Sequence, residues 1–440
     1  MIRGKRAIHK NIKRKYLLMK KFSKTAIIIA AVIVVFFAVM ILVMKGVFFS
    51  SKRHVRGIEN VAMTLDELEI PSDIRVIGIG EATHGNREFQ IAKLDLLKKM
   101  VEEGTCHSIA FEISVGEGVR INDAVHEQES DLTELVGTLD YPLYDTAEMV
   151  SLFEWMREYN KDKDYDDSVI FYGIDMQGAY TSAQHLTDFA KEHTGLFSEE
   201  EINALEIFAD LDRDDIPSRE IFESVYNKLA SETDTGYMIA AMCANTILQS
   251  VDAPGFDEDA NGYGEHRDLC MAQNVKRISE IEEARGYGQI IVTAHNGHVM
   301  KGGAESYGET AMGQRIDDLF EGSYFCIGTE FYNTCVNIHT AGTYDEEYER
   351  ADHDYCSDDV LAYQAKDFGG CYVLDYTSIT EDDGEVYKII HSDNFTGMAG
   401  EGYTVYMDLY KTYRIKLTVA DRYDAMIYYY ETTPIRCLHY

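Results

Sequence analysis

Five short apolar runs in this chain are each followed by an acidic residue or a histidine. The runs are Ile74–Ile79, Ser108–Phe111, Val169–Ile174, Gln289–Ala294 and Tyr324–Thr329. Short, near-continuous runs of β-branched and aromatic residues are typical of strands that are buried on both faces of a parallel sheet. Helices have to connect such strands. The sequence therefore predicts an α/β fold with a mainly parallel central sheet.

The polar residues occupy equivalent places after these runs. They are Glu81 with His84, Glu112, Asp175, His295 with His298, and Glu330. In an open α/β sheet, ligands bind beyond the carboxyl ends of the strands, so we expect these side chains to gather at one edge. A neutral imidazole can take a proton from water, and a neighbouring carboxylate can orient the ring. As an alternative, Glu81 and Glu112 can cap the helices that follow their strands.

The rest of the chain is expected to build around this sheet. Residues 88–103 have the apolar spacing of a helix, and residues 423–430 are a plausible last strand. Two long insertions, about 116–165 and 182–286, are mostly helical in pattern and are expected to form the walls of a cleft. Residues 73–440 are therefore interpreted as one domain.

The amino-terminal segment has the pattern of a membrane anchor. Residues 25–44 contain no charge, and twenty residues at 1.5 Å each match a hydrocarbon core of ~30 Å. Ten Lys and Arg residues precede this segment and four follow it closely, which favours a cytoplasmic tail over 1–24 and an extracytoplasmic body after a linker over 45–72. A cleaved signal peptide is the alternative, although its apolar region is normally shorter. We expect a single-pass protein of the cell membrane that contacts the bilayer through residues 25–44.

The charge of the exported part excludes one class of partner. Residues 1–56 hold 14 of the 41 Lys and Arg residues, which leaves 27 basic against 76 acidic residues and a net charge of about −49 for residues 57–440. A surface of this charge repels phosphate, so no nucleic-acid partner is expected. No protein partner is predicted either.

Several motifs of other enzyme classes are incomplete. The chain has no GxSxG and no Walker A sequence, and its Gly78-x-Gly80 lacks the third glycine of a dinucleotide site. The eight cysteines form no CxxC pair, and no disulfide pairing can be assigned. No serine or cysteine stands out as a nucleophile, so direct attack by water is the simplest mechanism.

Seven segments together resemble the erythromycin esterase family. They are GEATHGNREF (80–89), AFE (110–112), WMREYN (155–160), FYGID (171–175), HRDLCMAQN (266–274), TAHNGHV (293–299) and YDAMIYYYETTP (423–434). They occur in the order seen in that family, and the likeness spans roughly residues 74–434. The resemblance implies hydrolysis of esters or macrolide lactones in a deep cleft between the halves of an α/β core.

The resemblance also implies roles for single residues. His84 matches the general base that activates water, Glu81 is its paired acid, and Glu112 matches an essential acid. His295 and His298 match the histidine pair of the family. The residues expected to contact the substrate are Lys93, Glu88, Asp175, Arg267, Asn274 and Glu330. Lys93 stands where well-studied members have Arg, which removes bidentate contact and puts macrolide specificity in question.

Two other functions remain open from the sequence. Three histidines and several carboxylates are suitable zinc or manganese ligands, so a metal-dependent hydrolase or peptidase-like enzyme is one alternative. A non-catalytic module that binds a cell-surface ligand is the other. We expect a hydrolase of small-molecule esters that needs no cofactor, with the metal-dependent reading as the main competitor.

Overall fold

The computed structural model describes residues 24, 27–40, 51–213, 216–253, 262–302, 310–342 and 348–439. The chain divides into two compact units. One contains residues 1–51 and 405–412, and the other contains residues 52–404 and 413–440. The smaller unit includes helical residues 27–40 and the short helix α15 (Val405–Tyr410). All the residues predicted for the active site belong to the larger unit.

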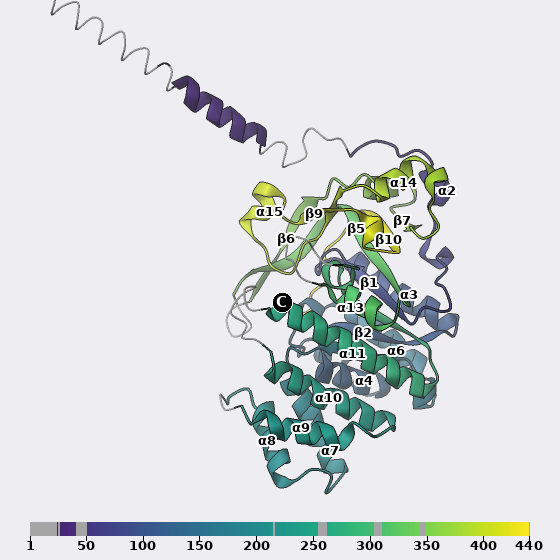
Figure 1. Cartoon of the computed structure of the whole chain (residues 1–440), viewed down its shortest axis with the longest axis vertical. Coiled ribbons are helices and arrows are strands. Elements are labelled where there is room, and N and C mark those ends of the chain that lie inside the picture. The colour runs from purple at the N-terminus through teal and green to yellow at the C-terminus, as the bar shows by residue number, and fades with distance from the viewer. Residues whose placement is uncertain are drawn as a thin grey trace, which may run out of the picture. The chain divides into compact units, whose positions relative to one another are not determined.

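The larger unit is built on an eight-stranded sheet with the strand order β3-β2-β4-β1-β5-β10-β7, in which β6 also pairs with β5 (Figure 1). The strands are β1 (Val76–Glu81), β2 (Cys106–Ser114), β3 (Ile170–Asp175), β4 (Gln289–His295), β5 (Tyr324–Ala341), β6 (Glu349–Cys356), β7 (Cys371–Asp375) and β10 (Ala425–Thr432). All neighbours from β3 to β10 are parallel, whereas β6 and β7 run antiparallel to their partners. The predicted mainly parallel sheet is confirmed, and β8 (Asn394–Gly397) and β9 (Arg414–Leu417) form a separate hairpin.

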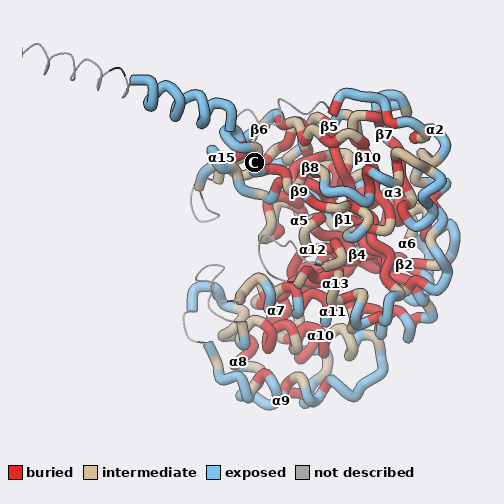
Figure 2. Tube along the Cα trace, turned by 45° about the horizontal axis from the view of Figure 1, so that its top comes forward, coloured by how far each residue is buried: buried red, intermediate tan, exposed pale blue. Residues whose placement is uncertain are grey.

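Alternate residues of the central strands enter two different hydrophobic cores. In β4, for example, Ile290 and Val292 belong to the core on one face, and Ile291 belongs to the core on the other. This alternation follows from the two-residue period of a strand, and it explains why the strands have apolar residues at consecutive positions. Figure 2 shows the buried residues concentrated along the sheet and the exposed ones on the outer helices.

Helices cover both faces of the sheet, as the sequence predicted. One core includes α3 (Arg87–Glu102) and α6 (Ala147–Asn160), and the other includes α7 (Tyr180–Glu192), α10 (Thr235–Val251) and α11 (Tyr263–Arg285). The remaining α-helices among the described residues of the larger unit are α2 (Ile58–Val61), α4 (Val115–His126), α5 (Leu132–Val136), α8 (Glu199–Ala209), α9 (Arg219–Leu229), α12 (Asn296–Val299), α13 (Met312–Leu319) and α14 (Glu385–Ile390). The two helical insertions thus correspond to α4–α6 and α7–α11.

Part of the segment predicted as a linker, residues 52–72 of 45–72, belongs to the larger unit and packs within it. Val55 is fully buried, and Arg53 and Arg56 both pair with Glu385. The backbone of Met63 exchanges two hydrogen bonds with Val373 of β7, at 3.1 and 2.8 Å. From Lys52 onward, apolar side chains and backbone pairing therefore fix this segment to the larger unit.

The predicted membrane span, 25–44, is described only in part. Residues 27–40 are helical, whereas residues 25–26 and 41–44 lie outside the described residues, as does the predicted tail 1–24 except for Lys24. Within the described residues, no helix combines the length and the apolar character needed to cross a membrane.

Candidate active site

Four neighbouring strands bring the predicted acids and histidines to one edge of the sheet. Glu81 ends β1 and lies beside His295, which ends β4, because the two residues are register partners. Glu112 lies in β2 on the other side of β4, and its carboxylate accepts a hydrogen bond from the His295 backbone N–H at 3.1 Å. Asp175 ends β3, the next strand. The strand order β3-β2-β4-β1 therefore assembles residues that are distant in sequence.

Glu81 and His84 form a buried acid–imidazole pair. Glu81 Oε1 lies 2.8 Å from His84 Nδ1, and Oε2 accepts hydrogen bonds from Gln90 Nε2 at 2.8 Å and from Lys93 Nζ at 2.7 Å. Burial opposes the charge on Glu81, but Lys93 and His84 outweigh it and lower the pKa of the carboxyl to about 2. Because an ionised Glu81 accepts the Nδ1–H, the lone pair of a neutral His84 ring lies on Nε2.

The environment of His84 also favours its protonated form. Burial alone would lower the pKa of His84, but the hydrogen bond and the charge of Glu81, helped by Glu112 and Glu401, raise it above 6.5. Its Nε2 makes no hydrogen bond with any residue that the structure describes. His84 therefore presents a basic nitrogen that can accept a proton from water once the ring is neutral.

Lys93 does not contact the open side of this pair. Its side chain is 1% exposed, and its Nζ donates to Glu81 and to Gln90 Oε1 (3.1 Å) and lies 5.0 Å from the centre of the Phe111 ring. The helix α3 directs this residue inward, and its contact with substrate stays a prediction. Its ammonium group instead balances the charge of Glu81.

His295 is held as a neutral ring. Its Nδ1 accepts the N–H of Gly297 at 3.2 Å, so the ring proton lies on Nε2, which donates to the Ala399 carbonyl at 3.2 Å. Burial, followed by the charges of His84 and His298, lowers the pKa of His295 to about 3. Its ring centre lies 5.0 Å from that of His84. With both nitrogens engaged, His295 is placed to shape the site and not to act as its base.

Arg267 of α11 bridges the carboxylates of Glu112 and Asp175. Its Nη2 donates to Glu112 Oε1 and to Asp175 Oδ2, both at 2.6 Å, and its Nε donates to Asp175 Oδ2 at 3.0 Å. Burial would raise the pKa of Glu112, but His298 and Arg267 outweigh it and hold that pKa well below its usual range. Glu112 and Asp175 are thus the counter-charges that keep a guanidinium group in the site.

His298 is the second cation of the cluster. Its Nδ1 lies 2.6 Å from Asp268 Oδ1, and its Nε2 lies 3.5 Å from Glu112 Oε1 and 3.4 Å from Arg267 Nη1. Burial and Arg267 oppose its charge, but Glu112 and Asp268 prevail and raise its pKa to about 9. His298 is therefore protonated at neutral pH, and 27% of its side chain is exposed.

Three of the residues predicted to bind substrate lie apart from this cluster. Glu88 accepts hydrogen bonds from the backbone N–H of Thr433 at 2.7 Å and from its hydroxyl at 2.6 Å. Asn274 is fully buried and donates to the Ile174 carbonyl at 2.9 Å. Glu330 is also fully buried and accepts from the Gly397 N–H at 2.7 Å and from the Thr396 hydroxyl. These contacts tie elements of the fold together and involve no member of the cluster, and contact of these three residues with substrate stays a prediction.

Sequence reasoning missed two contributors to the cluster. Asp268 helps to keep His298 charged. The only sequence signal for this role of Asp268 is its position directly after Arg267 in α11. The Ala399 carbonyl fixes the tautomer of His295, and a backbone atom leaves no signal in the sequence. Ala399 is brought to the site by β8, whose end is held by Glu330 and whose chain continues to pair with Ala82 (N–H to carbonyl, 2.9 Å).

The ring nitrogens of the cluster differ in what they leave open to a metal ion. His295 uses both of its ring nitrogens within the protein, whereas His84 and His298 each bind a carboxylate through Nδ1, as metal-binding histidines also do. Within the described ranges, no group of three or more His, Cys, Asp or Glu side chains is arranged to hold a metal ion. The cluster is better described as a network of charge-assisted hydrogen bonds.

Comparison with known proteins identifies the family. The model of the family described as erythromycin esterase matches residues 101–432. The chain belongs to the erythromycin esterase family. It is 25% identical over 317 residues to erythromycin esterase type II of Escherichia coli, which covers 63% of this chain and 73% of that protein. Membership implies the reaction class of an ester hydrolase with a small-molecule substrate.

Solved structures show the same fold at lower identity. A Bacillus cereus protein and a protein described as a succinoglycan biosynthesis protein each align with a TM-score of 0.66 and 18% identity, covering 87% of this chain and 98% and 97% of theirs. A mutant erythromycin esterase in its open conformation aligns with a TM-score of 0.56 and 14% identity, covering 83% of this chain and 92% of its own. At these identities the likeness shows the fold alone.

The charge of His298 can be tested directly. Asp268→Asn removes one of the two carboxylates that hold its proton, so the pKa of His298 should fall from about 9 toward the ordinary value near 6.5. The measurement is an NMR titration of isotope-labelled histidine rings. Asp188→Asn, an exposed acid on α7, is the control and should leave the His298 titration in place. An unchanged titration in Asp268→Asn would show that this contact does not set the charge.

Proposed function

We propose that this protein hydrolyses carboxylic esters, with lactones among the candidate substrates, by attack of a water molecule that His84 deprotonates. The observation that carries the proposal is the buried Glu81–His84 pair, in which Glu81 binds Nδ1 at 2.8 Å and leaves Nε2 without a partner among the described residues. A base has to be within hydrogen-bond reach of its proton donor, and a free Nε2 beside a cluster of charged groups meets that need.

His84 and Glu81 perform the proton transfer in this mechanism. Neutral His84 takes a proton from water at Nε2 as the water oxygen attacks the ester carbonyl. The ionised Glu81 then stabilises the imidazolium, as a carboxylate does in a serine-hydrolase triad. When the tetrahedral intermediate collapses, the C–O bond to the alcohol breaks and the imidazolium returns its proton to the leaving alkoxide, which restores neutral His84. General base catalysis of this kind contributes roughly 10²–10⁴ in rate.

The oxyanion requires hydrogen-bond donors, and positively charged donors stabilise it further. His298 and Arg267 supply them in this proposal, because both are cations at neutral pH and their nearest nitrogens lie 3.4 Å apart. Preorganised donors of this type commonly account for about 10²–10³ in rate each. Glu112, Asp175 and Asp268 act as positioning residues, since their carboxylates hold the two cations in place.

Water is the nucleophile in this proposal, and the one thiol that lies beside an imidazole on α11 does not compete with it. Cys270 Sγ is 3.4 Å from His266 Nε2. Burial raises the pKa of the Cys270 thiol to about 12, which keeps it protonated and unreactive.

We also propose that residues 25–44 anchor the enzyme in a membrane and place its body outside the cytoplasm. The support is the uncharged sequence of this segment, the basic residues before it, and the exposure of its described apolar side chains, such as Ile27 (64%) and Val34 (67%). A tethered enzyme of this kind would act on esters that reach the cell envelope.

The role of His84 leads to a first prediction. His84→Asn should lower kcat/KM for an aryl ester by roughly 10²–10⁴ and leave the melting temperature nearly unchanged, because the substitution removes the base but keeps a polar side chain. His391→Asn, at an exposed position after α14, is the control and should retain full activity. Full activity of His84→Asn would refute the proposed mechanism. Loss of wild-type activity on chelation, with recovery on adding zinc or manganese, would favour the metal-dependent alternative.

The proposed roles of His84 and His298 predict that kcat/KM depends on pH as a bell-shaped curve. The base has to be unprotonated, so kcat/KM should rise with pH through a pKa above 6.5, the raised value of His84. The oxyanion donor has to be protonated, so kcat/KM should fall as His298 loses its proton at about pH 9. The measurement is kcat/KM from pH 5 to 10, corrected for background hydrolysis. Asp268→Asn should move the falling limb to lower pH, and a profile without that limb would exclude His298 as the charged donor.

The anchor predicts how the full chain fractionates. The full-length protein should remain in the membrane pellet after alkaline carbonate washing. Val34→Glu with Phe37→Glu should release it, because a charged side chain at the centre of a span costs roughly 2.5–3.5 kcal/mol. Fractions from a bacterial host, probed by immunoblot, give the result. Wild-type protein in the soluble fraction would overturn the anchor while leaving the proposed reaction intact.

A further inference from the structure

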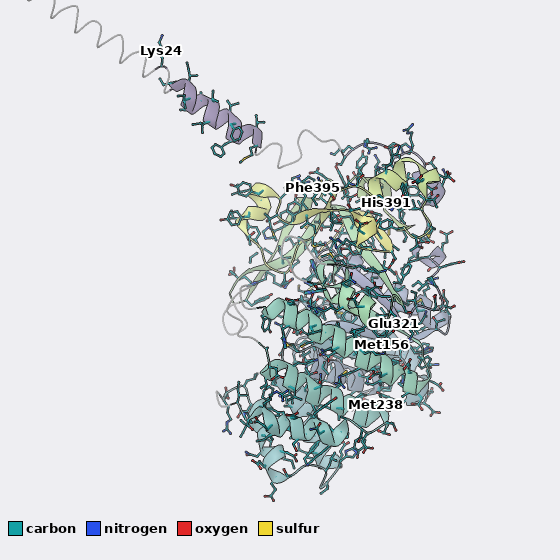
Figure 3. The ribbon with its side chains drawn as sticks, in the orientation of Figure 1. Lys24, Met156, Met238, Glu321, His391 and Phe395 are labelled. Carbon is teal, nitrogen blue, oxygen red and sulfur yellow. The ribbon has the colours of Figure 1, made fainter. Side chains whose placement is uncertain are left out.

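A surface cavity of about 290 Å³ lies between α4, α7, α10 and the edge strand β3. Met238, labelled in Figure 3, marks the helix α10 that forms one wall. None of the described residues that line this edge cavity belongs to the His84 cluster. The edge cavity is therefore a second concave site with its own chemistry.

The floor of the edge cavity is aromatic and apolar. Tyr172 of β3 and Phe189 of α7 contribute to it, belong to the same hydrophobic core, and are 4% and 8% exposed. The ring of His193 stacks on Phe189 with 3.9 Å between ring centres. A floor of this type favours the apolar part of a ligand and offers aromatic faces to a cation.

The rim of the edge cavity is acidic and has no basic counterpart. Asp123, Glu192 and Asp234 lie on it and are exposed, and none of the described lining residues is Lys or Arg. The side chains of Asp123 and Glu192 form no ion pair with a described residue. Burial, together with Glu127 and Glu192, raises the pKa of Asp123 to about 6, as expected for a carboxylate without a cation nearby.

Two imidazoles complete the set of polar groups. His193 Nδ1 lies 2.9 Å from the Phe189 carbonyl and donates to it, so Nε2 carries a lone pair when the ring is neutral. His185 Nε2 is buried and has no hydrogen-bond partner within the described structure. Burial lowers the pKa of His185, so this ring adds no positive charge at neutral pH. A buried ring nitrogen without a partner is costly unless a ligand supplies one.

We propose that the edge cavity binds a small organic ammonium compound, with its charged amine at the acidic rim and its carbon chain on the aromatic floor. The rim carboxylates and the His193 nitrogen are acceptors, and an ammonium group is a pure donor with positive charge. A bare metal ion fits less well, because no trio of His, Cys, Asp or Glu in the described ranges is arranged to hold one.

The test is calorimetric titration of the full-length protein in detergent with 1,6-diaminohexane and with 1,6-hexanediol. The diamine should bind and the diol, which has the same chain without charge, should not. Asp123→Asn combined with Glu192→Gln should weaken diamine binding by about tenfold or more, because two charge-assisted contacts are lost. Both residues are exposed, so the double variant is expected to fold, and circular dichroism checks this.

A matched control removes the same charge elsewhere. Glu154→Gln with Glu158→Gln changes two exposed acids on α6, the helix that carries Met156 in Figure 3, and should bind the diamine as the wild type does. Equal binding of diol and diamine, or wild-type binding by the Asp123/Glu192 variant, would overturn the proposal. Equal weakening by the control variant would also overturn it, since it would show attraction to the overall negative charge and not a site.

Discussion

The active-site edge depends on one buried carboxylate. Glu81 is fully buried and is held ionised by Lys93 on one side and His84 on the other. Taking a carboxylate and an ammonium group out of water costs several kcal/mol each, and only close pairing compensates for that cost. Because each partner needs the others, the ring of His84 is fixed relative to β1 and α3 before any substrate arrives.

Close pairing of opposite charges continues along the carboxyl edge of the sheet. The charged residues form two groups of ion pairs. One group consists of Lys93, Glu81 and His84, and the other consists of Asp268, His298, Arg267, Glu112 and Asp175. His295 lies between them as a neutral ring, because burial and then the charges of His84 and His298 disfavour its protonation. The cluster thus holds one imidazole with an open basic nitrogen, His84, and one that is protonated at neutral pH, His298.

Much of this arrangement could be predicted from the sequence. The strands β1 and β4 lie within two residues of their predicted runs, and their end residues converge because parallel strands share one carboxyl edge. What the sequence predicted less well is the direction of side chains on helices. Lys93 follows Phe89 by four residues, and both are buried on the inner face of α3, so helical spacing alone contained the signal that Lys93 points inward. The sequence did not show whether Arg267, Asp268 or both would face the cluster, since neighbouring residues on a helix point only about 100° apart.

The β8 segment gives the site a second source of order. Glu330 accepts a hydrogen bond from the backbone of Gly397, and two residues later the carbonyl of Ala399 accepts one from the His295 ring. Its continuation also pairs with Ala82, directly after Glu81. The backbone after Glu81 and the ring of His295 are therefore both held by the same residue, Ala399, from outside the parallel strands. Gly397 has no room for a side chain, since a Cβ there would lie 2.4 Å from the Phe331 ring, so the backbone path of this stretch requires a glycine at that position.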